Sequence, residues 1–428
     1  MNSRVLTLLL LSFGLLLVAL LLHLGAIAWM TLPFLAYLGV GIVQAPDRGK
    51  IRLQAVRSVE THREQGNVSV EVNLTLTSQG ATLDHLTLSD PLQPGMRVWK
   101  GQLRQPGALR SGEETRFSYT FRTERGTFAW KSLHVVAADP LGIIETELEV
   151  PAAAQVQVSP ELRRFRPFPL QAQRTLPSTG SIPARRGGSG TNFWGVREYH
   201  PGDPLRRLDW RLTARHPRQF FTKEFEQEAI ADIGLIVDAR GKTNLRRDDD
   251  SLFEHSARAA ASLAEVFLRQ GNRVSLLAWG DPMITVFPGY GKVQMNRVLR
   301  ALAKSSPALE SDGSLDDLQF VPVQMFPSHS LILVISPLAY NDWQLFPRLR
   351  AFGYQVLLVS PDPFDYVRTQ LASDQPTQLA SRLARLERQV ELARVARLWV
   401  PVIDWPVNHP LSPLVRQALG RAHIQLKR

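Results

Sequence analysis

The sequence predicts a multidomain protein with an N-terminal two-helix membrane hairpin, an all-β sandwich and a doubly wound α/β domain. Three successive patterns predict this: a long uncharged apolar run, apolar and polar residues alternating with period two, and apolar strands alternating with helices. We expect the hairpin at 1–46, the sandwich at 47–160, a basic linker at 161–190, a charged and aromatic segment at 191–230 and the α/β domain at 231–428.

The composition limits the chemistry that the chain can perform. The 428 residues are 44% hydrophobic, which is enough for several cores, and they include no cysteine. Disulfides, thiol nucleophiles and thiolate metal sites are therefore excluded. The formal net charge of +11 indicates an anionic partner, and both lipid headgroups and nucleic acid fit that description.

The first part of the chain is long enough to cross a bilayer twice. Residues 5–46 contain no Asp, Glu, Lys or Arg. As one helix they would reach about 63 Å, roughly twice the hydrocarbon thickness. We expect spans at Val5–Leu22 and Ala26–Val43 with a turn near His23, a kink at Pro33, and the lipid bilayer as the partner of residues 5–43. A signal peptide is the alternative, although the run is long for one and lacks an A-x-A site.

Positive charges flank the two spans on one side only. Arg4 precedes the first span, several basic residues from Arg48 onward follow the second, and the turn has none. The positive-inside rule therefore places both ends, and everything after residue 46, in the cytoplasm.

Period-two alternation predicts the sandwich. The clearest strand runs from Val68 to Leu76, and about seven short strands separated by Gly and Pro turns are typical of an immunoglobulin-like fold. Nothing in this domain resembles a site. The segment after it is basic, and we interpret it as an extended linker, with an arm that binds lipid headgroups or nucleic acid as the alternative. Its arginines are Arg163, Arg164, Arg166, Arg174, Arg185 and Arg186.

A dense motif follows the linker. The stretch from Val196 to Arg215 reads VREYHPGDPLRRLDWRLTAR and resembles the signature of the bacterial family known as domain of unknown function 58. The resemblance implies that a von Willebrand A-like domain follows and that the chain is a bacterial inner-membrane protein. Its soluble domains are expected in the cytoplasm from the flanking positive charges. The matching residues are Arg197, Glu198, Tyr199, Gly202, Asp203, Arg206, Asp209, Trp210, Ala214 and Arg215.

The motif alternates arginines with carboxylates around aromatic residues. Such residues form ion-pair networks, so we expect a brace that clamps this segment onto the next domain. Asp203 is expected to cap a helix that begins near Pro204, and Arg206 to meet Asp209 one helical turn away. Catalysis is disfavoured because His200 has no evident nucleophile and carboxylates beside arginines stay ionised.

The α/β domain begins with the buried strand Ile233–Asp238. Ligands of such sheets bind beyond the carboxyl ends of the strands. The resemblance implies a metal site of the form Asp-x-Ser-x-Ser there, but this chain reads Asp238-Ala-Arg-Gly-Lys242 and has no acidic residue directly after Ser336. We expect no metal and no cofactor. Arg240 and Lys242 either bind an external carboxylate or phosphate or form a salt bridge with Asp238.

A long helix near the C-terminus carries apolar residues at alternating spacings of four and three. They are Leu379, Leu383, Leu386, Val390 and Ala393. Because the run covers only two heptads, we expect the stripe to pack on the sheet, and a partner helix is the alternative.

The main functional hypothesis is a non-enzymatic, membrane-anchored interaction protein. The family resemblance implies a MoxR-type AAA+ ATPase as partner, in the assembly or maturation of other proteins. The alternative is binding of nucleic acid or anionic lipid through the basic linker and the motif, with nucleic acid the less favoured ligand. A hydrolase is less favoured still, and no small-molecule substrate is evident.

Overall fold

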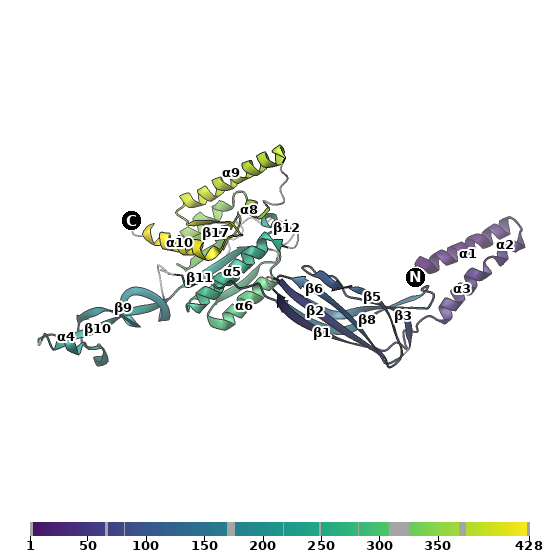
Figure 1. The fold of residues 1–428 in the computed structure, drawn as a ribbon, viewed down its shortest axis with the longest axis horizontal. Helices are drawn as coiled ribbons and strands as arrows, with labels where there is room; N and C mark the ends of the chain where they lie inside the picture. The colour runs from purple at the N-terminus through teal and green to yellow at the C-terminus, as the bar shows by residue number, and fades with distance from the viewer. Residues whose placement is uncertain are drawn as a thin grey trace. The chain divides into compact units, whose positions relative to one another are not determined.

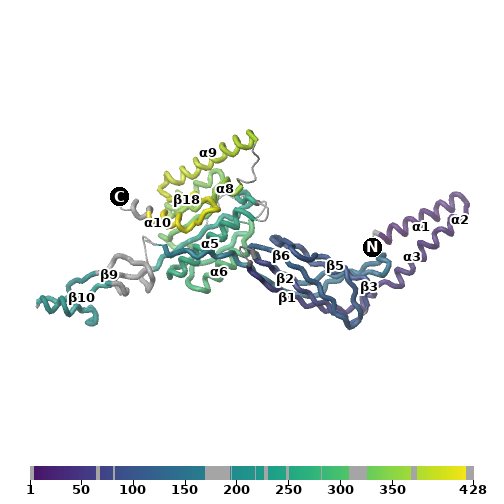
Figure 2. Tube along the Cα trace, viewed as in Figure 1, coloured from purple at the N-terminus to yellow at the C-terminus, as the bar shows by residue number. Residues whose placement is uncertain are grey.

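A computed structural model describes residues 3–64, 67–80, 82–168, 176–216, 218–247, 250–280, 282–307, 325–367 and 374–425. The chain divides into two compact units, Met1–Val158 and Ser159–Arg428. The first unit contains two N-terminal apolar helical segments and a β-rich region (Figure 1). The second contains a mainly parallel sheet covered by helices, together with a long β-ribbon (Figure 2).

The N-terminal residues fold as two apolar helical segments, as predicted. Segments Arg4–Leu21 and Gly25–Val43 are each long and apolar enough to cross a membrane. His23 lies in the turn between them with φ of 50°. The second segment is interrupted just before Pro33, where the Thr31 hydroxyl donates to the Ala28 carbonyl at 2.7 Å. The helices are α1 (Ser3–Leu21), α2 (Gly25–Trp29) and α3 (Leu32–Val43).

The β-rich region consists of two antiparallel four-stranded sheets around a shared core. Their strand orders are β1-β2-β6-β4 and β5-β3-β7-β8. Alternate residues of β2, from Val68 to Leu76, are buried against the inward residues of β3 and β7, as the period-two pattern predicts. The strands are β1 (Leu53–Glu64), β2 (Asn67–Ser78), β3 (Leu83–Ser89), β4 (Arg97–Gly101), β5 (Arg104–Leu109), β6 (Glu114–Thr123), β7 (Gly126–Ala138) and β8 (Glu145–Val158).

A buried ion pair crosses this core. Arg57 pairs with Asp90, and neither side chain is exposed. The Tyr119 hydroxyl donates to the other Asp90 oxygen at 2.9 Å, and Arg57 also donates to the Ala152 carbonyl at 2.7 Å. Burial raises the pKa of Asp90 and lowers that of Arg57, although each charge opposes the shift of the other. The two charges therefore depend on each other for stability.

The second unit is built on a six-stranded sheet of order β15-β14-β11-β16-β17-β18. All its pairings are parallel except that of β15 with β14. Helices α5, α6 and α10 pack on one face, and α7 and α9 on the other. The strands are β11 (Asp232–Asp238), β14 (Arg273–Trp279), β15 (Ile284–Gly289), β16 (Leu331–Ile335), β17 (Gln355–Pro361) and β18 (Val402–Trp405). The helices are α5 (Leu252–Arg269), α6 (Gly291–Lys304), α7 (Leu345–Ala351), α8 (Pro363–Val367), α9 (Gln375–Arg397) and α10 (Leu411–Gln425).

A β-ribbon precedes this sheet in the chain. Strands β9 (Leu176–Glu198) and β10 (Phe221–Ile230) pair antiparallel, and the short helix α4 (Trp210–Thr213) lies between them in sequence, at the end of the ribbon (Figure 1). Two-residue strands β12 (Arg246–Arg247) and β13 (Asp250–Ser251) pair before α5. Part of the expected linker therefore lies in β9.

The beginning of the expected linker packs against α5. Phe168 lies 5.8 Å from Phe267 between ring centroids, and the Arg163 amide donates to the Ser262 hydroxyl at 3.0 Å. Residues 159–168 therefore belong to the second unit. Arg174 lies outside the described residues, and nothing is described of the Arg185 and Arg186 side chains.

The prediction that the apolar stripe of α9 packs on the sheet is wrong. Leu379, Leu383, Leu386 and Val390 are 69%, 59%, 59% and 50% exposed. The residues that face the sheet lie near the C-terminal end of the helix and include Leu392 and Val395. These residues are about half a turn away from the stripe, so burying them directs the stripe outward.

Candidate functional site

Arg197 is the centre of the folded motif. Its guanidinium donates to both Asp203 oxygens, at 2.7 and 2.8 Å, and its Nε donates to Glu224 at 2.8 Å. Asp203 lies in the turn after β9, and Glu224 lies on β10 opposite Gly195. One arginine therefore fastens the turn to the neighbouring strand through a bidentate pair and a second carboxylate. We call residues 196–224 the signature tip.

The turn itself requires glycine. Gly202 has φ of +109°, which residues with a Cβ rarely adopt, whereas the space around it is open. The turn also brings the His200 amide within 3.0 Å of Asp203. The hydrogen bonds from Arg197, followed by that from the His200 amide, lower the pKa of Asp203 to about 2. The carboxylate thus stays ionised and acts as a fastener, not as an acid or base.

Asp209, not Asp203, caps the helix of the signature tip. One Asp209 oxygen accepts from the Arg211 and Leu212 amides, at 3.1 and 3.0 Å, at the start of α4. The residues after Pro204 form a 3₁₀ turn, η1 (Leu205–Arg207), without a side-chain cap. Since η1 ends before Asp209, the expected pair with Arg206 does not form in the described structure. Asp209 instead has Lys223 at 4.0 Å.

The remaining motif residues divide into two groups. Tyr199 contacts Phe220 edge-on at 6.4 Å, so it belongs to the packing of the signature tip. The other group is exposed, and no side chain in it forms a hydrogen bond or ion pair with another described residue. This group comprises Glu198, Arg206, Trp210 and Arg215.

The exposed group lies among further apolar side chains. Trp210 is 65% exposed, Leu205 67% and Phe220 59%. A small folded element that presents tryptophan, phenylalanine and arginine carries the residue types that are enriched in protein interfaces. The signature tip is thus fastened internally by Arg197 and Asp203 and presents an aromatic and charged surface outward.

A second cluster lies at the carboxyl edge of the sheet. Arg240 is fully buried and donates to both Asp238 oxygens, at 2.8 and 2.7 Å. It also donates to both oxygens of Asp342, at 3.2 and 2.6 Å. Burial disfavours its charge, but the hydrogen bonds and charges of Asp238 and then Asp342 raise the pKa of Arg240 overall. The guanidinium supplies a permanent positive charge between two carboxylates.

The loop after β16 completes this cluster. The Ser336 hydroxyl donates to Asp238 at 2.6 Å, and the Ala339 amide donates to Asp342 at 2.7 Å. Asp342 was not predicted as part of this edge, because it does not follow Ser336 directly in the sequence. The sequence signal that could have identified it is the short loop after β16, which brings Asp342 back to the carboxyl edge of the sheet. Lys242 is exposed, and of the two cations Arg240 makes the salt bridge with Asp238.

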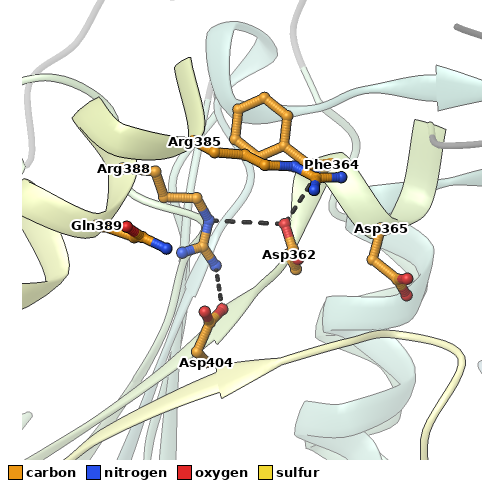
Figure 3. A pocket seen from close by; sticks show the side chains of 7 residues that line it. All are labelled: Asp362, Phe364, Asp365, Arg385, Arg388, Gln389 and Asp404. Carbon is orange, nitrogen blue, oxygen red and sulfur yellow. Dashed lines mark hydrogen bonds and ion pairs between the residues drawn. The ribbon is translucent and has the colours of Figure 1, made fainter. Parts of the chain in front are cut away.

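A cavity of about 450 Å³ opens farther along the same edge, beyond β17 and β18 (Figure 3). Arg388 of α9 reaches into it and donates to Asp404 at 2.7 Å and to the Ser360 hydroxyl at 3.1 Å. The lining is charged and of mixed sign, consisting of Asp362, Phe364, Asp365, Arg385, Arg388, Gln389 and Asp404. Within the described ranges, no group of three or more His, Asp or Glu side chains is arranged to hold a metal ion.

Comparisons with known proteins identify relatives of this chain. The chain is 26% identical over 293 residues to "Uncharacterized protein YeaD" of Bacillus subtilis, which covers 65% of this chain and 69% of that relative. It is 32% identical over 124 residues to "Uncharacterized protein Rv1480" of Mycobacterium tuberculosis, covering 27% of this chain and 37% of the relative. A local likeness to the FixG-related protein from Vibrio parahaemolyticus has 11% identity and a TM-score of 0.16, and covers 24% of this chain and 95% of that one.

A family model also matches the chain. Residues 195–365 match the family described as "Protein of unknown function DUF58". The matched region contains the whole signature tip and the Asp238–Arg240–Asp342 cluster. The family match and the Bacillus subtilis relative together support the DUF58 assignment of this region.

Proposed function

We propose that this chain is a non-enzymatic, membrane-anchored interaction protein whose signature tip docks a protein partner. The observation that carries the proposal is the division of the motif into fastening and exposed residues. Arg197 and Asp203 hold the fold of the tip, whereas Trp210 and Arg206 are presented to solvent. Exposed Trp and Arg on a preorganised element bind partners at a low entropic cost.

The partner class that the family resemblance implies is a MoxR-type AAA+ ATPase. The mixed charge of the exposed group suits a protein surface, because Glu198 and Arg215 would each find an opposite charge there. The ion pairs of the tip count against nucleic acid, since Arg197 is engaged by Asp203 and Glu224 and is not offered to phosphate.

The charges of the Asp238–Arg240–Asp342 cluster count against metal-dependent chemistry. Arg240 neutralises the two carboxylates that would otherwise attract a divalent cation. The six-stranded sheet with helices on both faces supports our proposal of a von Willebrand A-like domain, and the two antiparallel sheets support an immunoglobulin-like sandwich.

The anchor in this proposal is the pair of apolar helical segments. Their length and composition suit a bilayer, and the flanking arginines and lysine favour cytoplasmic soluble domains in a bacterial inner membrane. Proteolysis of right-side-out and inverted membrane vesicles tests this orientation. Cleavage of the soluble units in right-side-out vesicles would contradict it.

A pull-down with the full chain from a detergent extract tests the docking surface. Replacing Trp210 by alanine removes an exposed anchor without touching the ion pairs, so we expect partner recovery to fall by about 30-fold, the equivalent of about 2 kcal/mol for a central interface residue. Trp99→Ala is the matched control because Trp99 is 64% exposed but lies on β4 of the first unit.

Two results would contradict the proposal. Equal loss of partners in the Trp210 and Trp99 variants would show that the tip has no special role. If the recovered partners include no ATPase, the ATPase is excluded as the partner. The docking role of the tip is then judged by the Trp210 variant alone.

A further inference from the structure

The apolar stripe of helix α9 is exposed on the surface of the second unit. Its four large residues, Leu379, Leu383, Leu386 and Val390, are each at least half exposed. The N-terminal end of the helix also extends away from the sheet (Figures 1 and 2). Large apolar side chains aligned on one face in water are unfavourable, so such a face indicates a partner.

The opposite face of α9 is what holds it to the unit. Arg388 reaches Asp404 at 2.7 Å (Figure 3). It also donates to the Pro361 carbonyl at 3.3 Å, and Val395 is fully buried. Arg388 lies two residues after Leu386, which is about 200° around the helix. The same contacts that anchor α9 therefore direct its apolar stripe away from the domain core.

The width and spacing of the stripe fit a two-stranded coiled coil. At about 100° per residue the stripe is only about 80° wide, which matches a coiled-coil seam and is narrower than the apolar face of an interfacial membrane helix. In heptad notation Leu383 and Val390 occupy a positions. Leu379, Leu386 and Ala393 occupy d positions, where leucine favours two strands.

Two charged residues beside the stripe indicate which helix covers it and in which direction that helix runs. Arg382 occupies a g position and Glu387 the following e position, both exposed and neither paired with another described residue. In a parallel, in-register pair of identical helices, Arg382 of each copy meets Glu387 of the other. An antiparallel pair brings g to g and e to e, so it never joins these two residues.

We propose that a second copy of this chain covers the stripe, through a parallel two-stranded coiled coil of residues 379–393. The pairing is isologous, as expected of a twofold dimer. It does not depend on the proposed docking by the signature tip, because no residue of the tip takes part. An anionic bilayer fits less well, since Glu387 would face the lipid headgroups.

Site-directed disulfide formation tests the pairing in the full chain, in detergent micelles and in liposomes. The chain has no cysteine, so each introduced one reports alone. We expect Leu379→Cys, Leu386→Cys and Ala393→Cys each to cross-link between copies on mild oxidation. Arg385→Cys is the control, because position 385 is exposed beside Leu386 but outside the seam. Its cross-linked fraction should be clearly lower than that of the three seam positions.

A second set of variants tests the contacts. Adding Leu383→Asp to the Leu386→Cys chain should abolish cross-linking while the circular-dichroism spectrum of the folded chain stays unchanged, because position 383 is exposed in the single chain. Arg382→Glu and Glu387→Arg, each with Leu386→Cys, should each weaken cross-linking. A mixture of the two chains should restore it through opposite charges between the copies.

Several outcomes would overturn the proposal. Equal cross-linking at positions 385 and 386 would show random collision, and cross-linking only at 386 but at neither end would exclude the parallel register. If liposomes protect a cysteine at position 386 from a water-soluble maleimide and no cross-link forms, the bilayer, and not a second copy, covers the stripe. If the chain stays monomeric and cross-links only to other proteins in cells, the stripe binds a helix of another protein.

Discussion

Arg240 forms a bidentate ion pair with Asp238, its Nε 2.8 Å from one carboxylate oxygen and its Nη2 2.7 Å from the other. This pair lies at the carboxyl end of β11, near the point where the chain order of the sheet reverses and where such sheets commonly bind ligands. Asp342 pairs with the same guanidinium from a different loop. The Arg240 guanidinium thus lies between the carboxylates of Asp238 and Asp342.

Replacing Arg240 by alanine should strongly destabilise the second unit. The change leaves two buried carboxylates without their counterion, and breaking a buried pair in this way costs about 3–5 kcal/mol. The measurement is the unfolding midpoint of this unit, with hydrogen exchange in β11 and β16 as a local readout. Lys242→Ala is the control, because that side chain is exposed and its loss should change stability by about 0.5 kcal/mol or less.

Replacing Arg240 by serine should create a response to magnesium. The change places a hydroxyl beside Asp238, Ser336 and Asp342, and these hard oxygen ligands suit Mg²⁺. At a Mg²⁺ concentration one hundred times the Kd of the site, binding would stabilise the fold by about 2.7 kcal/mol. Tm measured against Mg²⁺ concentration should rise for this variant and stay constant for the natural chain. A flat curve for both would disprove the prediction.

The sequence predicted the elements whose signal is local. Period-two alternation identified the strand of Val68–Leu76, and the uncharged run identified the two apolar helical segments. The helical break before Pro33 was also predictable, because proline fixes its own backbone. The residue types of the motif indicated ion pairs, which the signature tip contains.

The specific partners within the motif depended on the turns, and these were not predictable from spacing. Asp203 was expected to cap a helix, but the positive φ of Gly202 turns it back to Arg197. The cap is made by Asp209 instead. The prediction that the α9 stripe packs on the sheet was wrong for a different reason. The spacing shows that its residues share one face of the helix, but it does not show which face meets the sheet.

The ion pair between Arg197 and Asp203 should keep the signature tip folded far into the acidic range. The folded pKa of Asp203, about 2, lies below the usual value of about 3.9 for an unfolded chain. Its stabilising effect is therefore fully present above about pH 3.9 and is lost as the pH falls through about 2. The amide signal of His200, which donates to Asp203, reports this by NMR with histidine labelling.

Asp203→Asn is the control for that titration. Asparagine is similar in shape but cannot ionise, so the His200 signal should lose its acidic transition near pH 2. An unchanged transition in this variant would assign the titration to another group.

Replacing Arg57 by alanine should destabilise the sandwich and make its stability depend on pH. Asp90 would remain buried without its cation, which costs about 3–5 kcal/mol at neutral pH. Burial already raises the folded pKa of Asp90 above its unfolded value, and removing Arg57 raises it further because that charge lowers it. Protonation then favours the folded state, so the variant should regain stability as the pH falls through the folded pKa of Asp90, until about pH 3.9.

Unfolding midpoints of the sandwich, measured between pH 4 and pH 8, check this prediction. Adding Asp90→Asn to the Arg57→Ala chain is the matched control, because asparagine occupies the same place beside Tyr119 but cannot ionise. This double variant should be more stable than Arg57→Ala alone at pH 8 and should lose the pH dependence. A loss of stability that is equal at both ends of the range would mean that lost packing of Arg57 against Trp130, and not the unpaired charge of Asp90, accounts for the effect.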